Sequence, residues 1–273
     1  MALGGVAALA LVLGASPAAA WELARTDRGA PVRWFAREAP LPFKVGATPP
    51  GDVALEVVTA VVQTAWGTWH QAGCDDVPTA AYRGLSPATD ATRPESLRAT
   101  PDNVVVFVPT EAAWSALGRS ASEVAITLVS NNDRTGEIVD ADILVNDGPW
   151  RFTLTASTGG VPGQVDLASV MTHEVGHALG LLHSADPTAT MYPTYTGVEP
   201  SGARTLADDD REGLCELYAG VPAHVEGELV EHCVGTPGPW AYVVLWLIAR
   251  RARRARRASR DVGEAGPAGP AQV

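Results

Sequence analysis

The chain has 273 residues, of which 46% are hydrophobic, and a formal net charge of −11 at pH 7. This length and composition suit one well-buried domain with terminal appendages. The chain has a single lysine, Lys44, in an acidic body. This body therefore lacks the clustered basic side chains that neutralise phosphates, which argues against nucleic acid as a partner.

Residues 1–20 have the pattern of a secretory signal peptide. An apolar stretch runs from Val6 to Leu13, and Ser16, Pro17 and three alanines up to Ala20 follow. Small residues at this place are typical of a cleavage site, which would leave Trp21 as the mature N-terminus. No basic residue precedes the apolar stretch, so a buried apolar helix remains the alternative. We expect an exported protein, located outside the cell or at its surface.

The first elements alternate between strand and helix patterns. Leu41–Val45 predicts a strand, which Pro49-Pro50-Gly51 ends. A helix is predicted from Asp52, a good N-cap, to Ala72-Gly73. It carries one apolar stripe at spacings of three and four residues, made of Leu55, Val58, Val62, Trp66 and Trp69. Three short runs rich in β-branched residues then predict strands at Thr79–Arg83, Val104–Val108 and Val124–Val129.

The next segment, Gly136–Asp147, alternates between apolar and polar residues. Asp140, Asp142 and Asn146 fall on the polar face, which predicts a half-exposed strand at a sheet edge. Trp150–Leu154 is its expected hairpin partner, and Thr158–Gly163 is expected to form a loop.

Two late helices complete the predicted domain. Asp166 is the expected N-cap of a helix from Leu167, and Asp208–Tyr218 fits another helix. Strands and helices in this order indicate a mixed α/β (α+β) domain rather than a regular βαβ wind.

The stretch His173-Glu174-Val175-Gly176-His177 carries chemistry. Positions i and i+4 share one face of a helix, so His173 and His177 can bind the same metal ion. Glu174 adjoins the first ligand and can hydrogen-bond a metal-bound water as a general base. A further histidine, His183, follows this stretch. At the composition of this chain, the probability that the pattern of five fixed positions ending at His183 arises by chance is on the order of 10⁻⁵.

His183 lies six residues after His177, where a continuous helix would point it away from the metal. Gly180 allows the chain to turn, because glycine adopts a left-handed conformation without steric strain. Three neutral imidazoles leave a fourth position open, which is typical of a catalytic zinc site; cobalt or nickel would bind as well.

At these residues the sequence resembles the metzincin superfamily and, within it, the matrixins. Ser184 follows the third histidine, and Met191-Tyr192-Pro193-Thr194-Tyr195 resembles the Met-turn and the segment that walls the S1′ pocket. Leu206–Tyr218 resembles the closing helix. The resemblance covers about residues 30–220. It implies a twisted, mostly parallel sheet with an antiparallel edge strand, a long helix, an active-site helix and a C-terminal helix.

The resemblance also implies roles for single residues. Met191 would form the floor beneath the zinc, and Pro193, Thr194 and Tyr195 would wall the substrate pocket. Ile138–Val145 would be the edge strand that binds a peptide as an added strand; an ordinary solvent-facing edge is the alternative. Calcium at Asp140 and Asp142 is a further expectation, against the alternative that both are merely solvated. The histidines of the family's structural zinc are missing, so we expect one zinc ion.

The three cysteines lack zinc-site spacing. In an oxidising compartment we expect one disulfide, between Cys74 and Cys215, since both are placed at helices of the same domain. Cys233 would then stay unpaired. Free buried thiols at all three positions remain the alternative.

The C-terminal part has an apolar segment followed by seven arginines between Arg250 and Arg260. It resembles the C-terminal sorting signals of exported bacterial proteins, and a disordered basic tail or interfacial helix is the alternative. We therefore divide the chain into a signal peptide (1–20), a catalytic domain (21–222), a linker (223–239), a sorting or membrane segment (240–260) and a disordered end (261–273).

The sequence predicts a monomeric, secreted or surface-attached zinc endopeptidase that hydrolyses protein or peptide substrates. The C-terminal tail is expected to contact a membrane or sorting machinery. The alternatives are a non-catalytic zinc-bearing surface protein and a zinc amidase acting on a non-peptide substrate. Glu174 argues against the first, because a binding protein does not need a general base.

Overall fold

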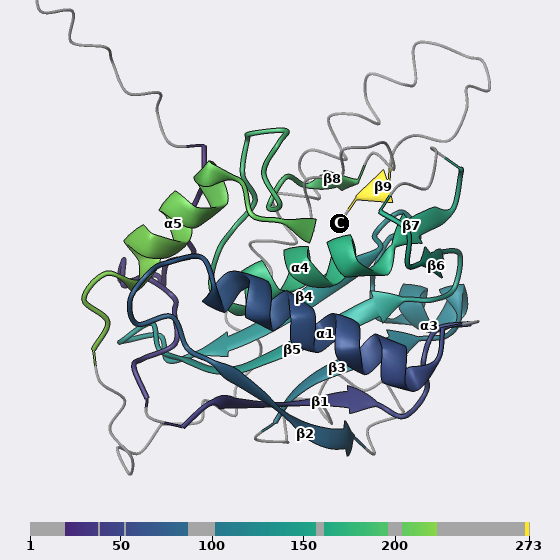
Figure 1. Ribbon diagram of the computed structural model, residues 1–273, viewed down its shortest axis with the longest axis horizontal. Helices are drawn as coiled ribbons and strands as arrows, with labels where there is room; N and C mark the ends of the chain where they lie inside the picture. Colours follow the sequence, from purple (N-terminus) through teal and green to yellow (C-terminus); the bar gives the residue numbers. More distant parts are fainter. Residues whose placement is uncertain are drawn as a thin grey trace, which may run out of the picture.

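The structure is a computed structural model that describes residues 20–37, 39–51, 53–86, 102–156, 161–195, 204–222 and 271–272. Its centre is a five-stranded sheet with the order β2-β1-β3-β5-β4 (Figure 1). The strands are β1 (Leu41–Gly46), β2 (Ala80–Ser86), β3 (Asn103–Val108), β4 (Ala125–Asn131) and β5 (Ile138–Asn146). All neighbours pair in parallel except β4 and β5, which are antiparallel. The predicted α/β fold with a mostly parallel sheet and an antiparallel edge strand is confirmed.

The identity of that edge strand differs from the sequence prediction. The alternating segment forms β5, which pairs with β3 on one side and with β4 on the other, so β4 lies at the edge. Asp140, Asp142 and Asn146 of β5 are buried, and two of them bind neighbouring backbone. Asp142 accepts a hydrogen bond from Val104 N (2.8 Å), and Asn146 donates to Glu123 O (2.9 Å). Alternation here separates two buried faces, and the prediction of a half-exposed edge was wrong.

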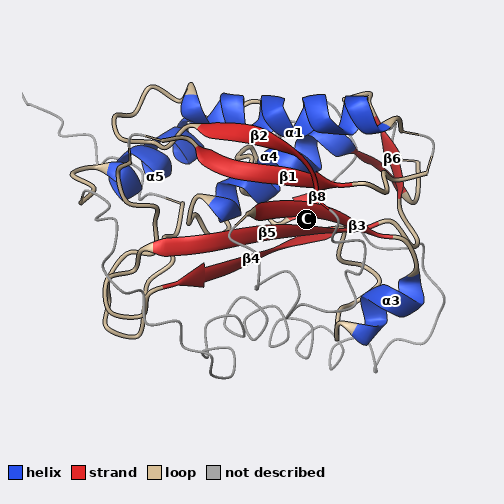
Figure 2. Cartoon of the chain, turned by 90° about the horizontal axis from the view of Figure 1, so that it is seen from below, coloured by secondary structure: helices blue, strands red, loops and turns tan. Residues whose placement is uncertain are grey.

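Two long helices cover one face of the sheet, and a short helix lies on the other face (Figure 2). α1 (Leu55–His70) buries four of the five predicted stripe residues: Val58, Val62, Trp66 and Trp69. Ala54 is at its N-cap position, so the helix begins later than predicted from Asp52, which lies outside the described residues. α4 (Leu167–Ala178) lies beside α1, and Trp69 Nε1 of α1 donates to Thr172 O of α4 (2.6 Å). α3 (Glu111–Ala116), which was not predicted, packs Trp114 against β3 and β5.

Two short pairings flank this core. β6 (Arg151–Thr153) pairs in parallel with β7 (Gln164–Asp166), so the predicted hairpin between Trp150–Leu154 and β5 is wrong. β8 (Thr194–Tyr195) pairs antiparallel with β9 (Ala271–Gln272) near the end of the chain (Figure 1). This pairing contrasts with the disorder that we expected throughout residues 261–273.

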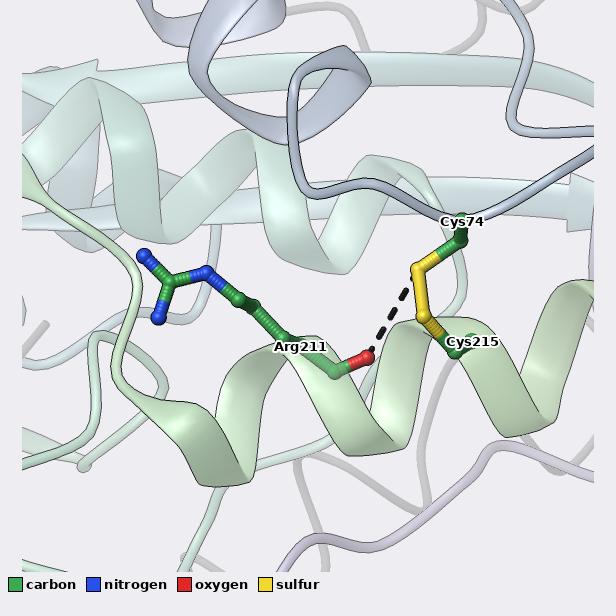
Figure 3. The surroundings of a disulfide bond; sticks show 3 residues. All are labelled: Cys74, Arg211 and Cys215. Atoms are coloured by element: carbon green, nitrogen blue, oxygen red, sulfur yellow. Dashed lines mark hydrogen bonds between the residues drawn. A yellow bond between two sulfur atoms is a disulfide. The ribbon is translucent and has the colours of Figure 1, made fainter.

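A disulfide joins the loop after α1 to the last helix. The bond links Cys74 to Cys215 of α5 (Asp208–Tyr218) over a sequence separation of 141 residues. Figure 3 also places the Cys74 sulfur next to the backbone oxygen of Arg211, at 3.7 Å. Since α5 also contacts the candidate site described below, this covalent link ties the loop after α1 to a helix that supports the site.

Removing this disulfide should lower stability strongly. We expect Cys74→Ser/Cys215→Ser to lose about 2–5 kcal/mol of unfolding free energy, because a cross-link over so long a loop restricts the unfolded chain. Urea unfolding followed by circular dichroism measures the loss. Cys233→Ser is the matched control and should unfold like the wild type; equal midpoints for all three proteins would contradict the prediction.

Within the described ranges, no helix is both long and apolar enough to cross a membrane. The expected signal peptide, apart from Ala20, lies outside those ranges. So do the predicted linker and the apolar, arginine-rich segment, residues 223–260.

Candidate metal centre

The helix that carries the histidine motif starts at a buried cap, as predicted. The Asp166 carboxylate accepts from the backbone N–H of Ser169 (3.0 Å) and from its hydroxyl (2.6 Å). Arg204 binds the same carboxylate through two nitrogens, at 2.6 and 2.7 Å. The charge of the fully buried Asp166 is therefore compensated, and the start of α4 is fixed in place.

The structure brings the three predicted histidines together. His173 and His177 lie one turn apart on α4, with their Nε2 atoms 3.1 Å from each other. The ring centroid of His183 lies 5.2 Å from that of His173 and 4.9 Å from that of His177. One nitrogen from each ring falls within 4.8 Å of the others. In the part of the chain that is described, no other cluster of His, Cys, Asp and Glu has this geometry.

A helix-ending turn brings His183 back to the first two histidines. Gly180 has φ of +102°, the left-handed conformation expected from the sequence. Leu181 N donates to Gly176 O (3.1 Å), and Gly180 N donates to His177 O (2.9 Å), which together form a Schellman motif. The same turn orients a ring, because Leu181 O faces Nδ1 of His177 at 2.8 Å.

These three side chains fit a zinc ion. Nδ1 of His173 lies 2.7 Å from Thr190 O, and Nδ1 of His177 faces a carbonyl as well, so both Nδ1 atoms must carry the proton. The lone pairs of the two Nε2 atoms then face each other and would repel without a cation between them. Tetrahedral zinc with Zn–N bonds of about 2.0–2.1 Å separates two ligand nitrogens by about 3.3 Å, close to the observed spacing.

Burial favours the metal-binding form of these rings. It lowers the pKa of His177 to about 4, and it lowers the pKa of His173 well below the usual value, with further contributions from His177 and His183. Both rings are therefore neutral at neutral pH, which is the protonation state that binds a metal.

Glu174 has the surroundings of a tuned carboxylate. Only 1% of it is exposed, and its Oε2 accepts a hydrogen bond of 2.6 Å from the hydroxyl of Thr127. Its Oε1 is buried without a hydrogen-bond partner among the described residues. Burial raises the pKa of Glu174 to about 7, against the opposing effects of the Thr127 hydrogen bond and the charge of Arg119. A carboxyl of this pKa can both accept and return a proton near neutral pH.

Met191 packs against the histidine helix at Gly176, and its role as the floor beneath the zinc stays a prediction. It is buried, and a side chain at Gly176 would meet its Sδ at 2.3 Å and Trp69 at 2.6 Å. Asp210 of α5 holds the segment that contains Met191, because its carboxylate accepts hydrogen bonds from Thr190 N (2.7 Å) and Met191 N (3.0 Å). It also accepts from Ala207 N (2.8 Å).

We expect Asp210→Asn to destabilise the domain by about 2–4 kcal/mol. The amide replaces one acceptor oxygen with an NH₂ group that faces a buried backbone N–H, so a charge-assisted hydrogen bond is lost and two donors meet. Thermal or urea unfolding measures the effect. The matched control is Asp208→Asn on the same helix, where the carboxylate is 96% exposed and the change should cost less than about 0.5 kcal/mol. Equal losses in both variants would refute this role of Asp210.

The expected pocket wall is anchored to the start of α4. Tyr195 is buried, and its hydroxyl accepts a hydrogen bond from Asp166 N (3.0 Å). Pro193 immediately precedes β8, whose first residue, Thr194, pairs with Gln272 of β9. The wall residues therefore lie near the N-terminal end of α4, and the pocket that they would line stays a prediction.

Two half-buried partners of the site were not found from the sequence. Thr127 is 47 residues from Glu174, and Arg204 is 38 residues from Asp166. Neither stands in a motif, since each contact depends on how β4 and the segment before α5 fold back onto α4. Asp140 and Asp142, the expected calcium ligands, are buried in β5. Whether they bind calcium stays a prediction.

The fold and the histidine cluster are consistent with a metzincin domain of the matrixin type. A comparison with family profiles gives a match to Matrixin over residues 112–219. That region holds α3, β4, β5, the histidine motif, the Met-turn and α5, so the match supports the resemblance to the matrixins on the part of the chain that carries the site.

Individual relatives match a shorter segment. The chain is 43% identical to matrilysin of Homo sapiens over 72 residues, which are 26% of the chain and 25% of that protein. It is 49% identical to matrix metalloproteinase-27 of Tupaia belangeri over 53 residues, or 19% of the chain and 10% of the relative. It is 44% identical to matrix metalloproteinase-25 of Mus musculus over 73 residues, which are 26% of the chain and 11% of that protein. The chain thus spans a quarter or less of the length of these relatives.

Proposed function

We propose that this protein is an endopeptidase that uses one zinc ion, held by His173, His177 and His183, to hydrolyse peptide bonds in proteins. The observation that carries the proposal is the convergence of three imidazole side chains next to a buried carboxylate with one unpartnered oxygen. Three protein ligands leave a position for water or substrate, as catalytic zinc sites require.

When bound, zinc would supply a Lewis acid that polarises the scissile carbonyl and makes water more acidic. Glu174 accepts a proton from the attacking water while the water oxygen bonds to the carbonyl carbon. It then passes this proton to the departing nitrogen as the C–N bond breaks. His173 and His177 are kept in the ligating tautomer by the carbonyl groups that their Nδ1 atoms face.

The substrate would bind beside β4. This strand lies at the sheet edge next to α4, and one edge of an outer strand has backbone groups free to pair with an extended peptide. The role that the resemblance suggested for Ile138–Val145 thus passes to β4. Pro193, Thr194 and Tyr195 would line the opposite side and choose which side chain follows the cleaved bond.

A non-catalytic zinc protein is a weaker explanation of this site. Burying a carboxylate with one unpartnered oxygen lowers stability, and a purely structural or binding role does not explain why the site has such a group. A non-peptide amide as substrate is the remaining rival. A cleavage assay on proteins and on cell-wall fragments separates it from the peptidase.

The test is digestion of a peptide library by the purified full-length protein, with cleavage sites read by mass spectrometry. We expect cleavage at internal bonds, loss of cleavage on treatment with a chelator, and recovery with one equivalent of zinc. Absence of cleavage by protein that holds one zinc per chain would overturn the proposed function.

We further propose that the protein is exported. The Cys74–Cys215 disulfide supports this, because such bonds persist in oxidising compartments. A sorting or anchoring role for residues 240–260, and the monomeric state, stay predictions. The N-terminal sequence of protein recovered from outside the cell tests export, with Trp21 as the expected first residue.

A further inference from the structure

The carboxylate of Glu174 has two oxygens in different surroundings. Oε2 lies 2.6 Å from the hydroxyl oxygen of Thr127, whereas Oε1 is buried and has no partner among the described residues. The side chain of a glutamate has three rotatable bonds, so adjacency to His173 alone does not fix the direction in which either oxygen points. A contact from another residue has to fix the orientation of the carboxylate.

Thr127 is placed to do this from a different element. It lies in the middle of β4, in register with Ile143 of β5, so its backbone is fixed by the sheet. Its hydroxyl oxygen also lies 3.0 Å from the backbone oxygen of Glu174. A hydroxyl has one hydrogen, which it can donate to only one of these two oxygens at a time. Oε2 is closer, and it is the stronger acceptor when the carboxylate is charged. The hydroxyl therefore connects the edge strand to the acidic side chain.

We infer that Thr127 is a positioning residue, which binds Oε2 of Glu174 so that Oε1 is the oxygen available to the attacking water. The inference rests on the proposed function, in which Glu174 accepts the proton of that water. Thr127 itself touches neither water nor substrate in this scheme. The peptide would also lie beside β4. One strand would therefore fix both the orientation of the base, Glu174, and the position of the substrate.

Three variants test the inference. Thr127→Val keeps the shape and removes the hydroxyl, Thr127→Ser keeps the hydroxyl, and Thr64→Val makes the same chemical change on α1, where the hydroxyl donates to Ala60 O (2.8 Å). For Thr127→Val we expect kcat to fall about 10- to 100-fold with KM and zinc content unchanged, as loss of one charge-assisted hydrogen bond would produce. Thr127→Ser should stay within about threefold of the wild type, and Thr64→Val should equal it.

Other outcomes would overturn the inference. Wild-type kcat in Thr127→Val would show that the contact does not matter for the reaction. An equal loss in Thr127→Ser, or a loss accompanied by lower zinc content, would indicate a packing role instead of a hydrogen bond.

Crystal structures of the same variants give a readout that does not depend on turnover. We expect more than one orientation of the Glu174 carboxylate in Thr127→Val and a single one in Thr127→Ser. One unchanged orientation in Thr127→Val would overturn the inference even if the wild type cleaves nothing. Failure of the proposed function is distinct, since it would appear as an inactive wild type that holds zinc.

Discussion

Replacing Glu174 by alanine should abolish nearly all peptidase activity while the protein keeps its zinc. We expect kcat to fall by at least about 10²-fold and up to about 10⁴-fold, the usual contribution of a positioned general base. The zinc content should stay at one per chain, because the metal is held by the three histidines and not by the carboxylate. Cleavage of a casein-type substrate and elemental analysis of the same preparation measure the two quantities.

Two further variants separate chemistry from size and stability. Glu174→Gln has the shape of the native side chain and can still accept a hydrogen bond from Thr127, but it cannot take up a proton at neutral pH, so it should be as inactive as the alanine variant. Glu56→Ala, at an exposed position in the first turn of α1, should be as active as the wild type. Normal cleavage by Glu174→Ala would contradict the assignment of the base.

Local patterns predicted most of the fold because the relevant interactions are local. The apolar stripe of α1, the cap at Asp166 and the left-handed turn at Gly180 each depend on residues within a few positions of one another. The spacing of the histidines works in the same way: two follow from one helix face, and the third follows from the turn.

The errors and omissions arise from contacts between distant segments. Alternation in β5 does not reveal whether its polar face meets water or buried backbone, and Asp142 is paired with Val104, 38 residues away. The Glu174–Thr127 contact depends on which strand lies at the edge, a property of the whole sheet. The partner of β6 was mispredicted for the same reason, because β6 pairs with β7 and not with the strand that directly precedes it, β5.

Replacing Gly180 by alanine should disrupt the metal centre strongly. Two penalties combine: the residue has φ of +102°, and an added Cβ would lie 2.1 Å from the backbone oxygen of Val32. Left-handed conformation alone costs a non-glycine residue about 1–2 kcal/mol. The backbone clash cannot be relieved by a side-chain rotation, so the turn has to move, and with it Leu181 and His183.

The matched control isolates the clash. Gly118 also has positive φ, +76°, but an added Cβ there meets nothing within 4 Å. Gly118→Ala should therefore cost only about 1–2 kcal/mol and leave zinc affinity unchanged. Gly180→Ala should lose at least about 3 kcal/mol of stability and at least about tenfold in zinc affinity, since the third ligand no longer meets the other two. Competition with a chromogenic chelator measures the affinity. If both variants bind zinc equally well, the turn at Gly180 does not place His183, and the geometric basis for a three-histidine site is lost.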